Sequence, residues 1–346
     1  MESGPADDRL KRAQGCLIGL LAGDALGSAV EFCSASYIAQ HHPDGVREMT
    51  DGGTYDTLAG QPTDDGELAL ALARSLIGRS RFDEEKIARA YVRWLSSEPF
   101  DQGGTISQAL AAGVRAMGTD AAVAEACRMR ASTTSQANGA LMRIAPLGIF
   151  GAGEPQDDLV RWARVDAQLT HAHPACMDAN AAYVVAIAAA IADGADGEGA
   201  YGAACAWAES AQAEATVRET LTKAKTELPE GFDGPKSGWV LIALQNAFYR
   251  LLHTDSFEQA LVDTVACGGD TDTTAAICGG LLGAVRGLEA IPAQWKAAVL
   301  TCRPKAGEPR AKRPRPVEYW PVDGLELAEK LLAAGKVDKL EDEDAG

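Results

Sequence analysis

Two short segments place neighbouring carboxylates beside hydroxyls and glycines, each directly before an apolar helical stretch. They are GQPTDDGE at residues 60–67 and GGDTDTT at residues 268–274. Helix capping explains one Thr or Asp in each segment. The remaining carboxylates repel one another unless they are protonated or bridged by a cation. Hard divalent cations take oxygen ligands of this kind, and the adjacent carboxylates suit two bridged ions. The candidate ligands are Thr63, Asp64, Asp65, Asp270, Asp272 and Thr273.

Helical elements are expected to position these segments. Leu68, Leu72 and Leu76 recur at four-residue spacing after the first segment. Aromatic residues make up only 6% of the chain, and runs of β-branched residues bounded by turns are almost absent. Gly- and Asp-rich breaks separate the helices at 51–66, 100–104, 193–199 and 229–238. The sequence therefore predicts an all-α protein with one helical domain over residues 9–300.

Small residues also recur at four-residue spacing in two predicted helices. Gly15, Gly19 and Gly23 form the first set, and the second set comprises Ala275, Gly279, Gly283 and Gly287. On a helix this spacing produces a flat strip that another backbone can approach closely. We expect these strips to pack tightly and to position the loops at their ends.

The composition changes in residues 301–346. A segment rich in Pro and basic residues precedes a short amphipathic helix at about 325–334 and the acidic end DKLEDEDAG. The basic run permits a nucleic-acid contact, but its prolines favour an extended strap over an acidic globule. We expect the acidic tail to be disordered.

The overall charge limits the classes of partner. The 346 residues contain 32 Lys+Arg and 49 Asp+Glu, a net charge of −17, which argues against general binding to nucleic acids or anionic membranes. The eight cysteines form no CxxC pair and are predicted to be reduced. The N-terminus lacks the pattern of a secretory signal, so we expect a cytoplasmic protein, and we expect a monomer. The apolar stretch 179–192 is predicted to be a buried helix rather than a membrane span.

Several stretches in chain order resemble the ADP-ribosylglycohydrolase family. They are GCLIGLLAGDALGSAVEF (15–32), GQPTDDGELALALARSL (60–76), EPFDQGGT (98–105), ANGALMRIAPLG (137–148), THAHP (170–174), KSGWV (236–240) and CGGDTDTTAAICGGLLGA (267–284). The resemblance covers residues 12–300. It implies an orthogonally packed all-α fold with a dinuclear Mg²⁺ or Mn²⁺ centre at the bottom of an ADP-ribose cleft. The six candidate ligands match the two ligand groups of that centre.

The resemblance also assigns two catalytic candidates. Glu31 matches a glutamate near the metals, although its residue type alone suits a surface or capping carboxylate. Asp101 matches an aspartate that one branch places beside the scissile bond, and a turn residue before Gly103 is the alternative. The family often has Asn at position 104 and Thr or Ser at position 66, where this chain has Gly. These departures put one substrate contact and one supporting hydroxyl in doubt.

The substrate-binding candidates lie in three segments. The resemblance places them along the ADP-ribose: Asn138, Gly139, Met142, Arg143, His173, Ser237, Gly238 and Trp239. His171 is expected only to shape its loop. Arg143 has a helix-surface position as its alternative, and Trp239 either stacks on adenine or packs in the core.

The activity implied by the resemblance is hydrolysis of ADP-ribose from modified protein side chains, with ADP-ribosyl-arginine as the first expectation. The partner would be an ADP-ribosylated protein, and the product would be free ADP-ribose. One alternative is another linkage: serine-linked, O-acetylated, polymeric or nucleobase-linked ADP-ribose. The other is a catalytically silent ADP-ribose-binding paralogue.

Overall fold

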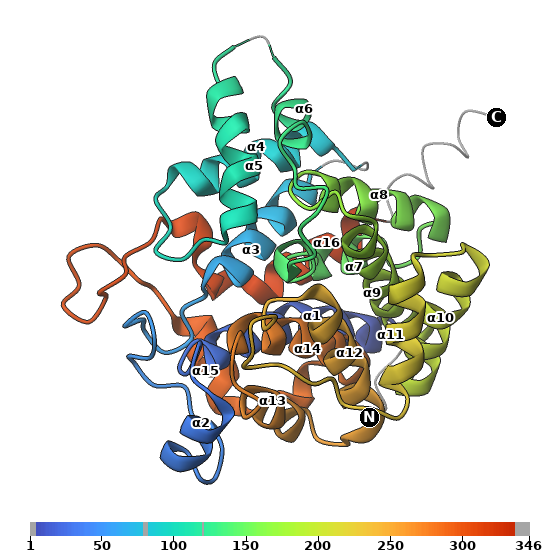
Figure 1. Cartoon of the computed structure of the whole chain (residues 1–346). Coiled ribbons are helices and arrows are strands. Elements are labelled where there is room, and N and C mark those ends of the chain that lie inside the picture. The colour runs from blue at the N-terminus through green and yellow to red at the C-terminus, as the bar shows by residue number, and fades with distance from the viewer. Residues whose placement is uncertain (1–4, 79–81, 120, 336–346) are drawn as a thin grey trace.

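The computed structural model describes residues 5–78, 82–119 and 121–335, and this part of the chain contains sixteen α-helices and no β-strand (Figure 1). The all-α prediction is confirmed. The helices are α1 (Pro5–Gly27), α2 (Ala35–His41), α3 (Asp64–Leu76), α4 (Glu84–Ser96), α5 (Gly104–Ala116), α6 (Val123–Arg128), α7 (Ala145–Phe150), α8 (Gln156–Gln168), α9 (Pro174–Asp193), α10 (Gly197–Ser210), α11 (Ala215–Ala224), α12 (Val240–His253), α13 (Phe257–Val265), α14 (Thr271–Arg286), α15 (Ala293–Thr301) and α16 (Gly324–Ala334). Short 3₁₀ turns include η3 (Val317–Tyr319) and η4 (Pro321–Asp323).

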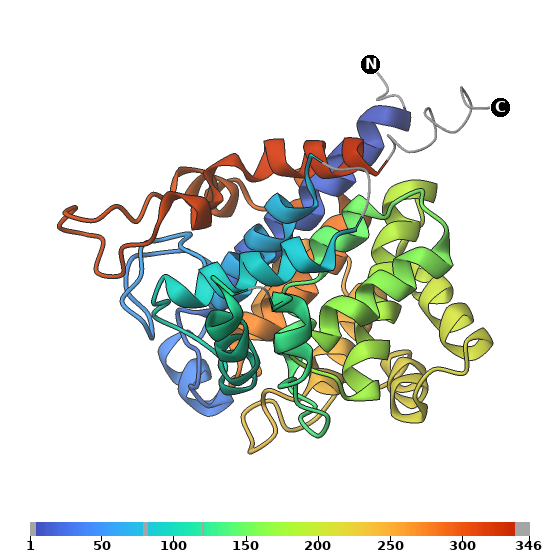
Figure 2. The ribbon, with the colours of Figure 1, turned by 90° about the horizontal axis from the view of Figure 1, so that it is seen from above.

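Helices α1 and α14 pack against each other at the centre of the molecule (Figures 1 and 2). The two small-residue strips form this contact. A Cβ atom added to Gly19 would lie 2.3 Å from the carbonyl oxygen of Gly279, and one added to Gly23 would lie 2.1 Å from that of Ala275. Only glycine permits this approach without movement of the backbone. The pairing is antiparallel, so the end of α1 lies beside the start of α14.

The other helices surround this pair. Helices α12 and α13 pack on α14, whereas α8 and α10 pack on α9. Helix α9 is long and apolar enough to cross a membrane by length and composition, but 78% of its most apolar window is buried inside the protein. Its apolar side chains therefore belong to the core, and the predicted buried helix is confirmed.

The C-terminal region continues the packed core beyond residue 300. Helix α16 forms over the predicted residues and packs against α1, α3 and α7. Its side chains Leu327, Ala328 and Leu331 are buried. The packed structure thus extends to residue 335, further than the 9–300 domain predicted above. The acidic tail at 336–346, expected to be disordered, lies outside the described residues.

Candidate active site

The two acidic segments lie at the N-termini of α3 and α14, but helix capping does not account for their side chains. Neither Thr63 nor Asp270, the residues in the N-cap positions, makes a side-chain capping bond. By contrast, Asp83 at the start of α4 accepts a hydrogen bond from the backbone of Lys86. The side chains of the two segments are therefore available for another role.

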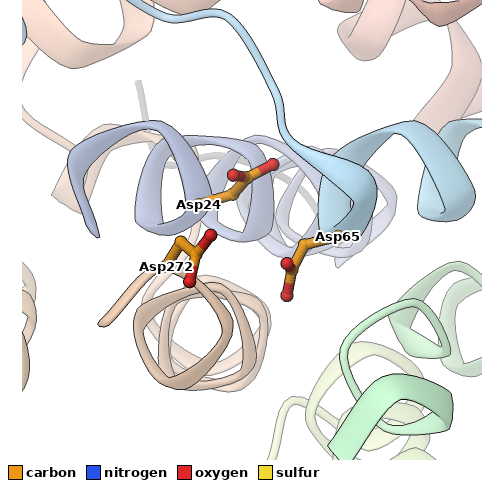
Figure 3. Close-up of side chains that lie close together, drawn as sticks. All are labelled: Asp24, Asp65 and Asp272. Carbon is orange, nitrogen blue, oxygen red and sulfur yellow. The ribbon is translucent and has the colours of Figure 1, made fainter. Parts of the chain in front are cut away.

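The structure brings the two segments together. The Thr63 hydroxyl lies 3.3 Å from Asp65 Oδ2 and 3.5 Å from Asp272 Oδ2, and the Thr273 hydroxyl lies 3.3 Å from Asp65 Oδ2. The two segments are separated by more than 200 positions in the sequence. In Figure 3, carboxylates from α1, α3 and α14 face a common space.

The α1 carboxylate belongs to Asp24, which the sequence analysis did not single out. Asp24 is fully buried, and its oxygens accept hydrogen bonds from Thr63 N, Thr63 Oγ1 and Gly66 N at 2.8–3.1 Å. Asp24 thus satisfies the first N–H groups of α3 from a different helix. A Cβ at position 66 would lie 2.6 Å from Asp24 Oδ2, which explains why glycine fits there. The available signal was a charged residue directly after the Gly15–Gly23 strip.

The carboxylates of this site have no Lys or Arg beside them among the described residues that line the cleft. Burial and neighbouring carboxylates raise the pKa values of Asp64, Asp65 and Asp272 well above their usual range. Two buried oxygens, Glu31 Oε2 and Asp65 Oδ1, have no hydrogen-bond partner. Hard oxygen donors, crowding and unpartnered atoms together fit divalent cations such as Mg²⁺ or Mn²⁺.

The acidic oxygens fall into two groups that share one residue. In each group the oxygens lie within 4.8 Å of one another: Asp24, Asp65 and Asp272 form one, and Glu31, Asp101 and Asp272 form the other. Asp272 therefore lies between two candidate cation positions. The predicted ligands Asp64 and Asp270 line the same cleft as Asp272. Asp64 Oδ2 accepts from Gly103 N at 3.2 Å, and Asp270 Oδ2 accepts from Asn138 Nδ2 at 2.8 Å.

Both catalytic candidates lie in this cleft, and a tyrosine lies near them. Glu31 and Asp101 line the cleft, which encloses about 220 Å³. Tyr55 lies near both carboxylates, and burial together with these negative charges raises its pKa. Sequence reasoning missed Tyr55 because the residue is far from both partners in the chain and belongs to no recognisable motif.

The substrate-binding candidates line two adjoining hollows. Asn138, Gly139 and Met142 line the cleft beside the carboxylates, whereas Gly238 and Trp239 line an outer hollow of about 410 Å³. The two segments pair directly, because Asn138 N donates to Gly238 O at 3.0 Å. Ser237 lies next to this pairing without lining either hollow. The indole Nε1 of Trp239 donates to Gln136 Oε1, which leaves part of the ring at the outer hollow.

The two histidines have the reverse of their expected roles, since His173 was expected beside the substrate and His171 was expected only to shape its loop. His173 accepts the backbone N–H of Ala175 as the N-cap of α9 and lies outside both hollows. His171 instead lines the cleft, its ring is 1% exposed, and its Nε2 has no hydrogen-bond partner. Burial and the nearby Arg143 lower the pKa of His171 to about 3, so a neutral imidazole faces the cleft.

Arg143 does not lie where a residue that contacts ADP-ribose is expected. Its side chain is completely buried and donates to Asp166 Oδ1 and Asp166 O at 3.1 Å, with its guanidinium 4.3 Å from the centre of the Tyr91 ring. Neither hollow is lined by this residue. The guanidinium is committed to a core ion pair, so it supports the 138–143 segment from behind and does not face a pyrophosphate.

Comparison with known proteins identifies the family. Residues 5–336 match the model of the ADP-ribosylglycohydrolase family. The chain belongs to the ADP-ribosylglycohydrolase family. Members of this family are hydrolases, and the resemblance seen in the sequence is confirmed.

Relatives and a solved structure agree with this assignment. The chain is 33% identical to ADP-ribosyl-[dinitrogen reductase] glycohydrolase of Rhodospirillum rubrum, over 82% of this chain and 88% of the relative. It is 27% identical to ADP-ribosylarginine hydrolase Tri1 of Pseudomonas putida, over 84% and 74%. A solved ADP-ribosylglycohydrolase-related protein complex covers 95% of this chain and 99% of its own, with a TM-score of 0.74 and 28% identity.

Proposed function

We propose that this chain hydrolyses the bond between ADP-ribose and an arginine side chain of a modified protein, with two divalent cations, and releases free ADP-ribose. The observation that carries the proposal is the pair of carboxylate groups that share Asp272, a buried residue that lines the cleft. Thr63, Asp64, Asp65, Asp270, Asp272 and Thr273 would hold Mg²⁺ or Mn²⁺ there. The similarity to hydrolases named for ADP-ribosyl-dinitrogen reductase and ADP-ribosylarginine supports this linkage.

Bound divalent cations supply a Lewis acid that lowers the pKa of a water molecule and stabilises negative charge. The chain's own residues do the rest. Asn138 and the neutral His171 orient the ribose, and Asp101 or Glu31 moves a proton between water and leaving group. The same carboxylates stabilise positive charge as it develops at the anomeric carbon.

The acidic lining favours an arginine acceptor over a neutral one. A modified guanidinium is cationic, and Asp64, Asp101 and Glu31 surround its expected position. The rings of Tyr55 and Phe100 lie 5.4 Å apart, and Phe100 directly precedes Asp101, so an aromatic pair adjoins the acidic lining. Gly104 leaves the acceptor side open, because no atom lies within 4 Å of an added Cβ.

The test is release of free ADP-ribose from arginine-linked, serine-linked and O-acetylated substrates by purified chain, after chelation and after addition of Mg²⁺ or Mn²⁺. We expect metal-dependent release from the arginine-linked substrate. Release from only the serine-linked or the O-acetylated substrate would show that the enzyme acts on that linkage and not on the arginine linkage. Binding of ADP-ribose with no release from any substrate would indicate a catalytically silent paralogue.

A further inference from the structure

The segment between α15 and η3, residues 303–316, crosses the side of the molecule that carries the cleft loops. We call it the strap. In Figures 1 and 2 it appears as the orange-red loop beside the light-blue loop that leads into α3. Arg313 and Arg315 of the strap contact the segments that carry Tyr55, Glu67 and Ser97, and Arg310 pairs with Asp51.

Arg315 joins two of the segments that build the site. Its side chain is only 3% exposed, and its Nε and Nη2 donate to the two oxygens of Glu67 at 2.7 and 2.8 Å. The same guanidinium donates to Ser97 O at 2.8 Å and to Ser97 Oγ at 2.7 Å. Glu67 follows Asp65 by two residues, and Ser97 precedes Asp101 by four. One planar side chain thus connects the first turn of α3 with the loop that carries Asp101.

Arg313 reaches the third segment. Its Nε donates to the carbonyl oxygen of Tyr55 at 2.8 Å, and its own carbonyl accepts from Gln61 Nε2 at 2.7 Å. Tyr55 is the residue that lies near Glu31 and Asp101, and Gln61 precedes Thr63 by two residues. The strap therefore contacts the backbone of Tyr55 and the side chain of Gln61, shortly before the start of α3, at the same time.

We propose that the strap is a positioning element for the reaction, in which Arg315 and Arg313 fix Asp101 and Tyr55 relative to the carboxylates of α3. The proposal rests on the function proposed above for the same cleft. The loop from Ser97 to Gly103 contains no helix or strand, and Glu98 has a left-handed backbone with φ 55°. Such a loop needs an external anchor, because ordering a flexible loop costs conformational entropy.

The chemistry of the contact requires arginine in particular. A guanidinium donates two parallel bonds to one carboxylate and further bonds to a second group, whereas a lysine ammonium is a point charge without this fork. Arg315→Lys therefore keeps the charge beside Glu67 but loses the geometry that connects it with Ser97. Removal of Arg315 alone would leave Glu67 buried and unpaired, which destabilises proteins strongly. The double variant Arg315→Met/Glu67→Gln avoids that unpaired charge.

The experiment measures kcat, KM and the Kd of Mn²⁺ for Arg315→Lys and for the double variant, well below the Tm of each. The matched control is Arg74, which pairs with both Asp323 oxygens at 2.6 and 2.8 Å. It joins the same helix α3 to the same C-terminal region, away from the cleft. We expect kcat to fall, or the Kd of Mn²⁺ to rise, by about 10-fold or more in the Arg315 variants. Arg74→Lys and Arg74→Met/Asp323→Asn should lower only the Tm.

A second pair of variants tests the strap without disturbing buried charge. Arg313 and Arg310 are both exposed, but the hydrogen bonds of the Arg310 side chain go, among the described residues, to Asp51 alone, with the shorter at 2.6 Å. Arg313→Met should lower kcat about 2- to 10-fold, as expected for the loss of one hydrogen bond, whereas Arg310→Met should not.

The positioning role is overturned if folded Arg315 variants keep kcat and Mn²⁺ affinity within twofold of wild type, or if the Arg313 and Arg310 variants behave alike. Failure of the proposed function is a separate result. In that case wild type itself releases no ADP-ribose, and Mn²⁺ affinity of the Arg315 variants still tests the strap.

Discussion

Asp65 and Glu67 lie two residues apart in the first turn of α3, and each is 1% exposed, yet their surroundings differ. Glu67 has a resident cation, because Arg315 donates to both of its oxygens and Trp94 Nε1 adds a third bond. Around Asp65, the described residues that line the cleft provide other carboxylates and no Lys or Arg. One side of the turn is neutralised within the protein, and the other is not.

This difference separates a structural carboxylate from a functional one. An ion pair completed by the protein holds elements together and needs nothing further. A group of buried carboxylates without a resident cation is costly unless something positive binds there. The side of α3 that faces Asp272 is therefore the side on which an external divalent cation is expected to act.

The largest effect should follow from Asp272→Asn. Asp272 belongs to both carboxylate groups, so its replacement should weaken both cation positions. We expect release of ADP-ribose to fall by more than about 10³-fold, beyond the range for one lost electrostatic contact. Circular dichroism should show a folded protein. Full activity in this variant would remove the metal-based account.

Asp101→Asn should have the next largest effect. It keeps the size of the side chain but removes a group that can accept and return a proton. We expect kcat to fall about 100-fold or more. Binding of ADP-ribose, measured by calorimetry, should change little. A matched control is Asp83→Asn at the start of α4, a capping residue remote from the cleft, which should leave kcat unchanged.

Asp24→Asn should have a smaller effect, because Asp24 positions Thr63 and Gly66 from behind. We expect a loss of activity or Mn²⁺ affinity of about 10- to 100-fold, the range found for groups that orient metal ligands. A loss as complete as that of Asp272→Asn would contradict the smaller effect expected for a residue that belongs to only one of the two carboxylate groups.

The smallest effect concerns stability in the absence of metal. Burial raises the pKa of Asp24 from 3.8 to about 7 and that of Glu31 from 4.5 to about 8. Between the ordinary and the raised pKa values, the folded chain binds more protons than the unfolded chain. The free energy of unfolding therefore falls as pH rises from about 4 to about 8. We expect the Tm of chelated wild type to drop by about 2 °C or more from pH 5 to pH 8.

Asp65→Asn serves as the control for this pH dependence. It removes a neighbouring negative charge, so the drop in Tm should be smaller in the variant. The pKa of His171 is lowered, so its contribution to stability rises with pH, but this contribution is the same in wild type and in Asp65→Asn. An equal or larger drop in the variant would contradict repulsion among the carboxylates.

The sequence was sufficient for the helical fold, the close-packing strips and the two acidic segments, because each rests on local spacing. It could not assign residues whose role depends on distant partners. Arg143 follows Gly139 in a substrate segment, but its guanidinium pairs with Asp166 in α8. Tyr55 and Arg315 reach the site only because loops that are remote in sequence meet in the fold. His171 and His173 differ because the ring of His173 caps the start of α9, whereas that of His171 lines the cleft.

The most direct test is the number of Mn²⁺ ions bound per chain at neutral pH, measured by equilibrium dialysis after chelation. The two carboxylate groups predict two ions for wild type and a severe loss of both in Asp272→Asn. The variant Glu67→Gln, which alters the neutralised side of the same turn, should still bind two ions at saturating Mn²⁺, even where loss of the Arg315 contact raises the Kd. Absence of bound Mn²⁺ in wild type, or unchanged binding in Asp272→Asn, would contradict the account.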